Sequence, residues 1–298
     1  MAGHTHGAKH PSRDKSRLLF IAMIMTATFM VVEVIGGLIS GSLALLADAT
    51  HMLTDAAALG LAWGATRVAK RPADAKRSYG YERFQVLAAF TNGLALLVLV
   101  VWIFIEAFHR ITEPSEILAV PMLLIASLGL IVNLVIAAVL HKDHKHDMNV
   151  EGAFLHVMSD LLGSVATIMA GLVIYFSGWT LIDPILSIGV GLLILRVGWR
   201  LVRRAAHILL EGTPESLDLE ALKSSLIARV PELTDIHHIH VWLLTTERPL
   251  MTMHATIAEG ADPGPVLLRI KSELHENFGI SHSTVQIEGG ACADDHIH

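Results

Sequence analysis

Six long apolar segments follow one another through the first two thirds of the chain. A helix needs about 20 mostly apolar residues to cross the hydrocarbon core of a bilayer, and each segment reaches that length. Short runs of glycine, serine and proline interrupt the apolar pattern between the segments, as turns do. The pattern predicts six transmembrane helices, at 18–39, 42–66, 84–108, 118–140, 152–176 and 180–201.

The last third of the chain has the mixed polar and apolar character of a water-soluble domain. A proline near the start of its second helical segment and Gly279 after the end are typical boundary signals. The fold class predicted for the whole chain is an α-helical polytopic membrane protein with a C-terminal α+β domain of order αββαβ. The predicted elements of that domain lie at 216–230, 236–245, 250–258, 263–278 and 283–288.

Basic residues near the ends of the apolar segments predict the orientation in the membrane. Sixteen lysines and arginines lie in the parts that would share one side, whereas Arg110 alone lies on the other side. Because cytoplasmic loops are enriched in Lys and Arg, we expect both termini in the cytoplasm. The short loops suit the inner (plasma) membrane of a bacterium. The expected parts are a His-containing cytoplasmic tail (1–17), a six-helix transmembrane domain (18–208), a cytoplasmic αββαβ domain (209–290) and a C-terminal tail (291–298).

Composition narrows the classes of protein and site. Only 17% of the residues are charged, against about 25% in a typical soluble domain. A single cysteine, Cys292, excludes an internal disulfide framework and argues against a cysteine-based zinc site. The 18 histidines are clustered along the chain. No basic patch with interleaved aromatic residues is present, so nucleic-acid binding has no support.

Two identical His-x-x-x-Asp pairs lie inside predicted membrane helices. His51 and Asp55 belong to the second segment, and His156 and Asp160 belong to the fifth. Residues four apart leave the same face of a helix. An ionisable side chain in the centre of a bilayer costs about 2.5–3.5 kcal/mol on insertion scales, so these groups need compensation. Each pair could simply form a hydrogen bond that joins two helices.

The repetition of the motif favours a metal site instead. Face to face, the pairs would supply two imidazole nitrogens and two carboxylate oxygens, which is a complete tetrahedral set for Zn²⁺. Mg²⁺ and Ca²⁺ prefer an all-oxygen shell, whereas Cd²⁺, Co²⁺ and Ni²⁺ remain further candidates.

Among other polar residues of the segments, Glu33 is expected to form an interhelical hydrogen bond. Asp48 would orient a ligand or serve a proton path; equally, it could form hydrogen bonds at the start of its helix. Asp183 would cap the helix at whose start it lies.

The whole chain from about residue 15 to 290 resembles the cation diffusion facilitator family, particularly its zinc-transporting branch. The motifs that carry the resemblance are Gly36-Gly37, the run Ser40 to Asp55, Tyr79-Gly80-Tyr81-Glu82-Arg83, Asn92-Gly93, His156 with Ser159-Asp160 and Gly163-Ser164, His237-His238-Ile239-His240-Val241-Trp242, and the run His282 to Glu288. The resemblance implies a homodimeric metal/proton antiporter in the lipid bilayer, whose transport ligands fall on the two His/Asp pairs named above.

The resemblance also implies regulatory metal ligands in the cytoplasmic domain, which would sense zinc and stiffen the dimer. They fall on His237, His254 and Glu288, with His282 as a further candidate. Strand alternation would place His238 and His240 on one face and His237 on the other.

Two features of the loops are implied by the same resemblance. Asp74 would belong to a second metal site in the loop after the second helix, but Arg77 and Tyr81 stand where some members have histidine, which argues against that site. Arg83 and Glu211 resemble a charge interlock, with ordinary solvation as the alternative.

These observations predict a secondary active transporter that exports Zn²⁺ in exchange for protons. The chain is not expected to be an enzyme or to need an organic cofactor. One alternative is a membrane metalloenzyme, which would need an open metal position and a nearby base; the pattern His-Glu-x-x-His is absent. The other alternative is a metal importer or channel, because the residues indicate a site better than they indicate the direction of flow.

Overall fold

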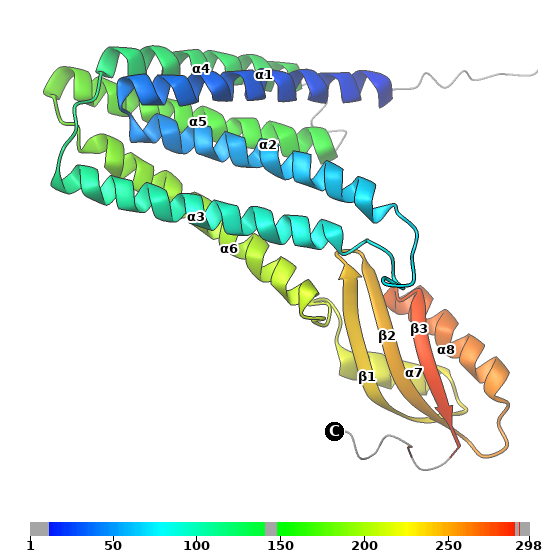
Figure 1. Cartoon of the computed structure of the whole chain (residues 1–298). Coiled ribbons are helices and arrows are strands. Elements are labelled where there is room, and N and C mark those ends of the chain that lie inside the picture. Colours follow the sequence, from blue (N-terminus) through cyan, green and yellow to red (C-terminus); the bar gives the residue numbers. More distant parts are fainter. Residues whose placement is uncertain (1–11, 141–147, 290–291, 293–298) are drawn as a thin grey trace, which may run out of the picture. The chain divides into compact units, whose positions relative to one another are not determined.

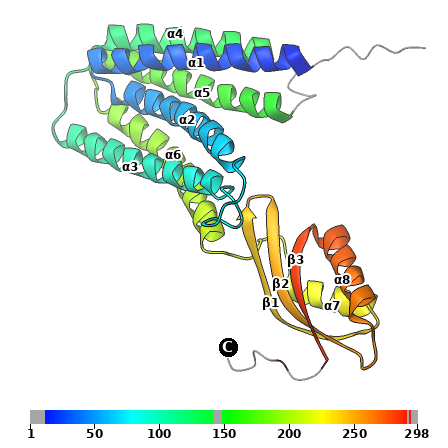
Figure 2. The same ribbon diagram turned by 45° about the vertical axis from the view of Figure 1, so that its right-hand side comes forward.

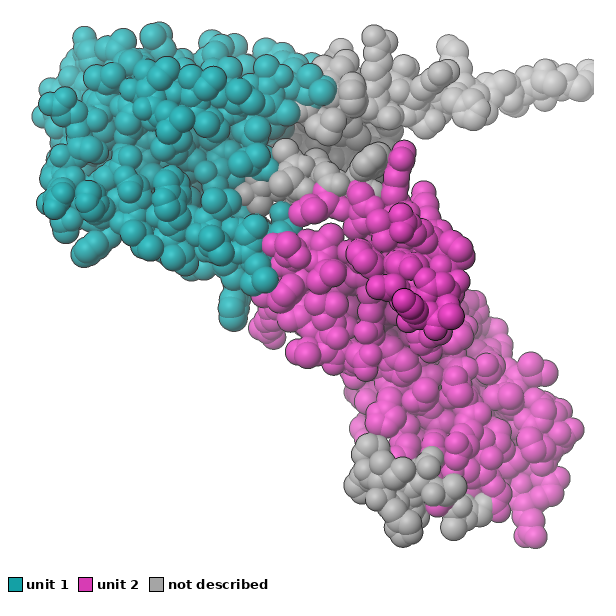
Figure 3. All heavy atoms as spheres, viewed as in Figure 1, with its two compact units in different colours: residues 1–60, 92–199 teal, residues 61–91, 200–298 magenta. Residues whose placement is uncertain are grey.

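A computed structural model describes residues 12–140, 148–289 and 292 of the chain. Within these ranges, the side chains of 12–23, 54–60, 62–63, 66, 140, 148–156 and 159 lie outside the described part. The chain forms two compact units, Met1–Gly60 with Asn92–Trp199, and Leu61–Thr91 with Arg200–His298 (Figure 3). Each unit is described by itself below.

Six long helices make up the apolar part of the described chain. They are α1 (Ser12–Ser40), α2 (Leu43–Ala69), α3 (Phe84–Thr112), α4 (Ala119–Leu140), α5 (Met148–Ser177) and α6 (Ile182–Leu209). Within the described residues, α3, α4, α5 and α6 each contain a stretch long and apolar enough to cross a membrane, and α1 and α2 contain shorter apolar stretches. The fold predicted for this part of the chain is confirmed.

The first unit is a bundle whose helices expose apolar side chains outward. The helix α4 packs against both α1 and α5, and the start of α2 shares a small apolar core with α4 and α5 (Figure 1). Large residues such as Val98, Leu124 and Leu193 nevertheless remain 69%, 67% and 69% exposed. Such apolar surface is costly in water and favourable against lipid tails, so the chain is a multi-pass membrane protein.

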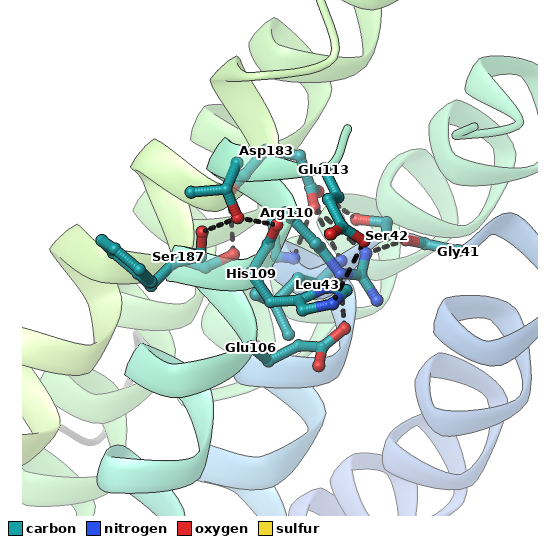
Figure 4. A network of polar contacts seen from close by, with 12 residues as sticks. Gly41, Ser42, Leu43, Glu106, His109, Arg110, Glu113, Asp183 and Ser187 are labelled. Atoms are coloured by element: carbon teal, nitrogen blue, oxygen red, sulfur yellow. Dashed lines mark hydrogen bonds and ion pairs between the residues drawn. The ribbon is translucent and has the colours of Figure 1, made fainter. Parts of the chain in front are cut away.

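A buried carboxylate fastens the start of α2 to the start of α6 (Figure 4). Asp183 of α6 is fully buried, and its two oxygens accept hydrogen bonds from the Ser42 hydroxyl at 2.5 Å and from the amides of Leu43 at 2.7 Å and Ala44 at 3.1 Å. The first amides of a helix lack partners within that helix, and a carboxylate favours this positive end. The predicted role of Asp183 as a cap of its own helix is therefore wrong, because its carboxylate caps α2.

Arg110 of α3 completes this cluster. Its guanidinium lies 3.9 Å from the carboxylate of Asp183, bonds Glu106 at 2.8 Å, and donates to the carbonyl of Gly41. Gly41 adopts a positive φ of 71°, which glycine tolerates without strain. The beginnings of α2 and α6 and the end of α3 are thus joined through a single network.

The second unit contains a three-stranded sheet covered by two helices on one face (Figure 2). Its elements run α7 (Leu219–Arg229), β1 (Leu233–Thr245), β2 (Arg248–Ile257), α8 (Pro263–Phe278) and β3 (His282–Glu288), which confirms the predicted αββαβ order. The strand β2 lies in the middle, antiparallel to β1 and parallel to β3. Buried apolar residues of both helices pack on the sheet and form the core.

A bulge interrupts β1 between His237 and His240, where the register with β2 shifts. His238 adopts a φ of 49° at this point, in the left-handed region that a side chain rarely enters. Bulges bend a strand and re-aim its side chains. The alternation predicted for these histidines is wrong for this reason, since the ring of His238 lies 5.3 Å from that of His237 and 5.0 Å from that of His254.

Candidate metal sites

The candidate transport site lies on α2 and α5. His51 is half-buried on α2 and Asp160 is 4% exposed on α5. Asp55 and His156 belong to the same two helices, but their side chains lie outside the described residues. The structure therefore gives side-chain positions for one ligand of each predicted pair.

Additional carboxyl groups surround this region of the bundle. Glu33 of α1 is 1% exposed, lies within hydrogen-bonding reach of Asp48, and interacts electrostatically with Asp160. The interhelical hydrogen bond of Glu33 stays a prediction, and its buried position next to Asp48 favours it. A cluster of three acids from α1, α2 and α5 inside a membrane bundle is costly without a cation nearby.

Gly163 of α5 faces Asp48 of α2 next to these acids. A Cβ atom added at Gly163 of α5 would lie 3.6 Å from the Oδ1 atom of Asp48 on α2. The start of α2 and the end of α5 share one apolar core, which contains Leu45 and Ile174, so the two helices run antiparallel.

The second candidate site lies on the three strands of the small domain. His237 on β1 pairs directly with His254 on β2, and Glu288 ends β3. The Oε2 atom of Glu288 lies 3.0 Å from Nε2 of His237, and its Oε1 atom lies 3.0 Å from Nδ1 of His254. Three of the four predicted regulatory ligands are thus brought together.

His282 lies elsewhere. It begins β3, where it pairs with Leu250, and Glu288 ends the same strand. Its ring packs edge-on against Tyr79 with 6.2 Å between the ring centroids. Six residues of extended strand span about 20 Å, so the structure does not bring His282 into the cluster.

Cys292, and not His282, is the fourth member of the cluster. One ligand atom from each of His237, His254, Glu288 and Cys292 lies within 4.8 Å of all the others. The Sγ atom lies 3.4 Å from Nδ1 of His254. Sequence reasoning missed this residue, because a lone cysteine argues against a site made only of cysteines. The available signal was its position, four residues after a predicted ligand.

The charge state of Glu288 suits a ligand. Burial would raise the pKa of its carboxyl, but hydrogen bonds from Gln286 and Cys292 and the nearby imidazoles of His254 and His237 outweigh burial and lower the pKa. The group is therefore ionised near neutral pH, and an ionised carboxylate binds a cation without first losing a proton.

The carboxylate of the loop residue Asp74 is engaged in hydrogen bonds within its own turn. Its Oδ1 atom accepts hydrogen bonds at 2.8 Å from the amides of Lys76 and Arg77, and its Oδ2 atom accepts one at 2.6 Å from the Tyr81 hydroxyl. The guanidinium of Arg77 stacks over the Tyr81 ring at 4.7 Å. The Tyr81 hydrogen bond is the main reason that the pKa of Asp74 is lowered. These contacts give the carboxylate a structural role.

Replacing Asp74 with alanine is accordingly expected to leave metal binding unchanged. The variant should loosen the turn, because two amides lose their acceptor. Hydrogen exchange at Lys76 and Arg77 should become faster, while the number of zinc ions bound per chain stays the same. A fall in bound zinc would show that Asp74 is a ligand after all.

The predicted charge pair is formed. The guanidinium of Arg83 lies 3.1 Å from the carboxylate of Glu211. Glu211 follows α6 with a φ of 60°, a conformation that glycine usually supplies at helix ends. The two side chains are 36% and 63% exposed, so the pair contributes little stability.

Comparisons with known proteins agree with this architecture. Residues 19–210 match the family model for the cation efflux transmembrane domain, and residues 214–289 match the model for the cation efflux protein cytoplasmic domain. A zinc transporter ZitB of Pectobacterium atrosepticum is 48% identical over 98% of this chain and 91% of its own length. A cadmium, cobalt and zinc/H⁺–K⁺ antiporter of Bacillus subtilis is 38% identical over 95% of this chain and 92% of its own length.

A solved structure also matches part of the chain. It is the metal-bound C-terminal domain of the CzcD transporter of Cupriavidus metallidurans, at 30% identity, covering 24% of this chain and 99% of that one with a TM-score of 0.23. The two family models together cover almost the whole sequence. The chain therefore belongs, as its motifs predict, to the cation efflux family of membrane transporters, also called the cation diffusion facilitators, and is not an enzyme.

Proposed function

We propose that this protein exports Zn²⁺ from the cytoplasm in exchange for protons, with Cd²⁺, Co²⁺ and Ni²⁺ as further candidate substrates. It acts in the bacterial inner membrane, with both termini in the cytoplasm. Zinc as the substrate is supported by the 48% identical zinc transporter, and exchange for protons by the name of the antiporter that is 38% identical. The excess of basic residues on one side supports the orientation.

The helical register carries the proposal for the transport site. Asp48 on α2 faces Gly163 on α5, and the two helices are antiparallel. His51 follows Asp48 by three residues, and Asp160 precedes Gly163 by three. Each step of three residues is about 4.5 Å along a helix axis, in the same direction in space. His51 and Asp160 therefore lie at the same depth.

The same register aligns the other two positions. Asp55 follows Asp48 by seven residues, and His156 precedes Gly163 by seven, which is about 10.5 Å along both axes. Each histidine then stands level with the aspartate of the other helix. A tetrahedral zinc site on these four positions would take its two imidazoles and two carboxylates from one stretch of the two helices.

This ligand set explains how protons could drive the metal out. Two carboxylates neutralise the charge of one dication, and two neutral imidazoles complete its shell without adding charge. Histidine ordinarily titrates near pH 6.5, and a protonated imidazole cannot bind metal. A site that opens to a more acidic exterior would therefore bind protons and release zinc.

The small domain is assigned to sensing and assembly. The functional parts are a membrane domain at 18–208 and a cytoplasmic domain at 209–290, flanked by tails at 1–17 and 291–298. The cluster around Glu288 supports regulatory metal binding. The family model matched by 214–289 is named for dimerisation, which supports a homodimer.

Flux measurements on the reconstituted protein test this function. Vesicles would contain a zinc-sensitive dye, and a pH difference would be imposed across the membrane. We expect zinc to enter faster when the interior is more acidic than the exterior, because outward protons would drive it. An imposed zinc gradient should in turn move protons in the opposite direction.

The alternatives give different results. A channel would pass zinc at a rate set by the zinc gradient and the membrane potential, with no proton movement. An importer would show the same coupling with the opposite preferred direction in right-side-out membranes. Zinc flux without any proton flux would overturn the antiport proposal.

A further inference from the structure

The carboxylate of Glu288 is the buried centre of the cluster on the small domain. Its side chain is 7% exposed, and its Oε2 atom has no hydrogen-bond partner among the described residues. The same holds for Nε2 of His237, although the two atoms are only 3.0 Å apart. Buried polar atoms without a hydrogen bond need an explanation, and one cation close to both atoms would satisfy them together.

Neighbouring residues orient His237 for this role. Its Nδ1 atom lies 3.3 Å from the carboxylate of Asp235, which in turn lies 3.0 Å from the ammonium of Lys223. A metal-binding histidine almost always bonds a carboxylate or carbonyl through its other ring nitrogen, because that bond fixes the tautomer and the ring orientation. The nitrogen of His237 that faces Glu288 is thus the one available to a metal.

Cys292 supplies a ligand of a different chemical kind. Its sulfur lies 3.4 Å from Nδ1 of His254 and within 4.8 Å of a ligand atom of His237 and of Glu288. In a tetrahedral zinc site with one sulfur, the ligand atoms are about 3.2–3.8 Å apart, given metal–ligand bonds of about 2.0–2.3 Å. The four ligand atoms here already lie within 4.8 Å of one another, so only small side-chain rotations are needed.

We propose that His237, His254, Glu288 and Cys292 form a closed four-ligand site within one protomer, and that the thiolate of Cys292 makes it selective for Zn²⁺ and Cd²⁺. This inference rests on the regulatory role proposed above for the cluster. Thiolate ligands favour soft and borderline metals over Mg²⁺, Ca²⁺ and Mn²⁺. On binding, the metal replaces the thiol proton, which is released to water, and a sulfur–metal bond forms.

Two consequences follow for sensing. Four protein ligands leave no position for a reactive water, so the site is suited to binding and not to hydrolysis. The metal would also hold the chain after β3 against the sheet, since Cys292 lies four residues beyond Glu288. Regulation by zinc would then depend on a residue outside the three strands.

Cobalt spectroscopy on the full-length protein in detergent tests the assignment. Tetrahedral Co²⁺ bound to a thiolate gives a sulfur-to-metal charge-transfer band in the near ultraviolet. Because the chain has one cysteine, this band would report on Cys292 alone. We expect the wild-type protein to show the band, and Zn²⁺ or Cd²⁺ to remove it by displacing cobalt.

Three variants give the test its controls. Cys292→Ser should abolish the band and weaken Cd²⁺ binding at this site by about 10-fold or more. Glu288→Gln should lose the band as well, because the site would lack its central ligand. His282→Ala is the matched control on the same strand and should keep both the band and the affinity.

The failure of this inference is distinguishable from failure of the transport proposal. A wild-type protein that transports zinc but shows no thiolate band would overturn the assignment of Cys292, as would a Cys292→Ser variant with unchanged Cd²⁺ affinity. A protein that shows the band but moves no zinc in vesicles would leave the assignment intact and contradict the transport proposal.

Discussion

An Asp160→Asn variant is expected to lose zinc transport by at least about 100-fold. Substitution of residues that only support metal ligands already costs about 10- to 100-fold, so loss of a ligand should cost no less. Asparagine keeps the size of the side chain but removes its charge. A bound Zn²⁺ would then retain a net positive charge inside the membrane, where an unpaired charge is costly.

The control for this experiment lies on the same helix. Thr167 is 4% exposed on α5, and its hydroxyl bonds only the carbonyl of Gly163, one turn earlier, among the hydrogen bonds of the described residues. Thr167→Val keeps the volume and should transport zinc close to the wild-type rate. Transport by Asp160→Asn at the rate of this control would remove Asp160 from the site.

Removing the buried cap of α2 should have the second large effect, on stability. Asp183→Ala would leave the hydroxyl of Ser42 and the amides of Leu43 and Ala44 without their acceptor. Arg110 would also lose one of its two nearby carboxylates. Breaking a buried charged interaction from one side typically costs about 3–5 kcal/mol. The thermal unfolding midpoint in detergent should fall markedly.

A graded series separates this cap from a general packing defect. Ser42→Ala removes one of the three hydrogen bonds to Asp183 and the bond that the Ser42 hydroxyl accepts from the amide of Leu45, and should cost about 1–2 kcal/mol. Asp183→Asn keeps the volume and one acceptor oxygen and should fall between the other two variants. Equal midpoints for Asp183→Ala and the wild type would show that the network contributes nothing to holding α2 in place.

The parts of the fold that the sequence predicts are those governed by simple repeats. Membrane thickness dictates the length of apolar helices, so α3 to α6 are visible as uninterrupted apolar runs. In the small domain, changes of hydrophobic period and the boundary residues Pro263 and Gly279 mark the αββαβ order. These signals lie within each element, so a single sequence is enough to predict the elements.

The features that escaped prediction depend on contacts between distant segments or on backbone irregularity. Asp183 caps a helix that begins 140 residues earlier, which no local pattern reveals. The bulge at His238 reverses the alternation on which its predicted face depended. His282 resembles a ligand by its neighbours in sequence, but strand length separates it from Glu288. Cys292 joins the cluster only once three strands are assembled.

X-ray absorption at the zinc edge tests the central claim most directly, in a Glu288→Gln/Cys292→Ser variant that lacks the cytoplasmic cluster. The account predicts one zinc per chain, bound by two imidazole nitrogens and two oxygens at about 2.0–2.2 Å. That zinc should disappear when either His51 or His156 is replaced by alanine. An unchanged spectrum after either replacement, or a six-oxygen shell, would contradict a shared site on α2 and α5.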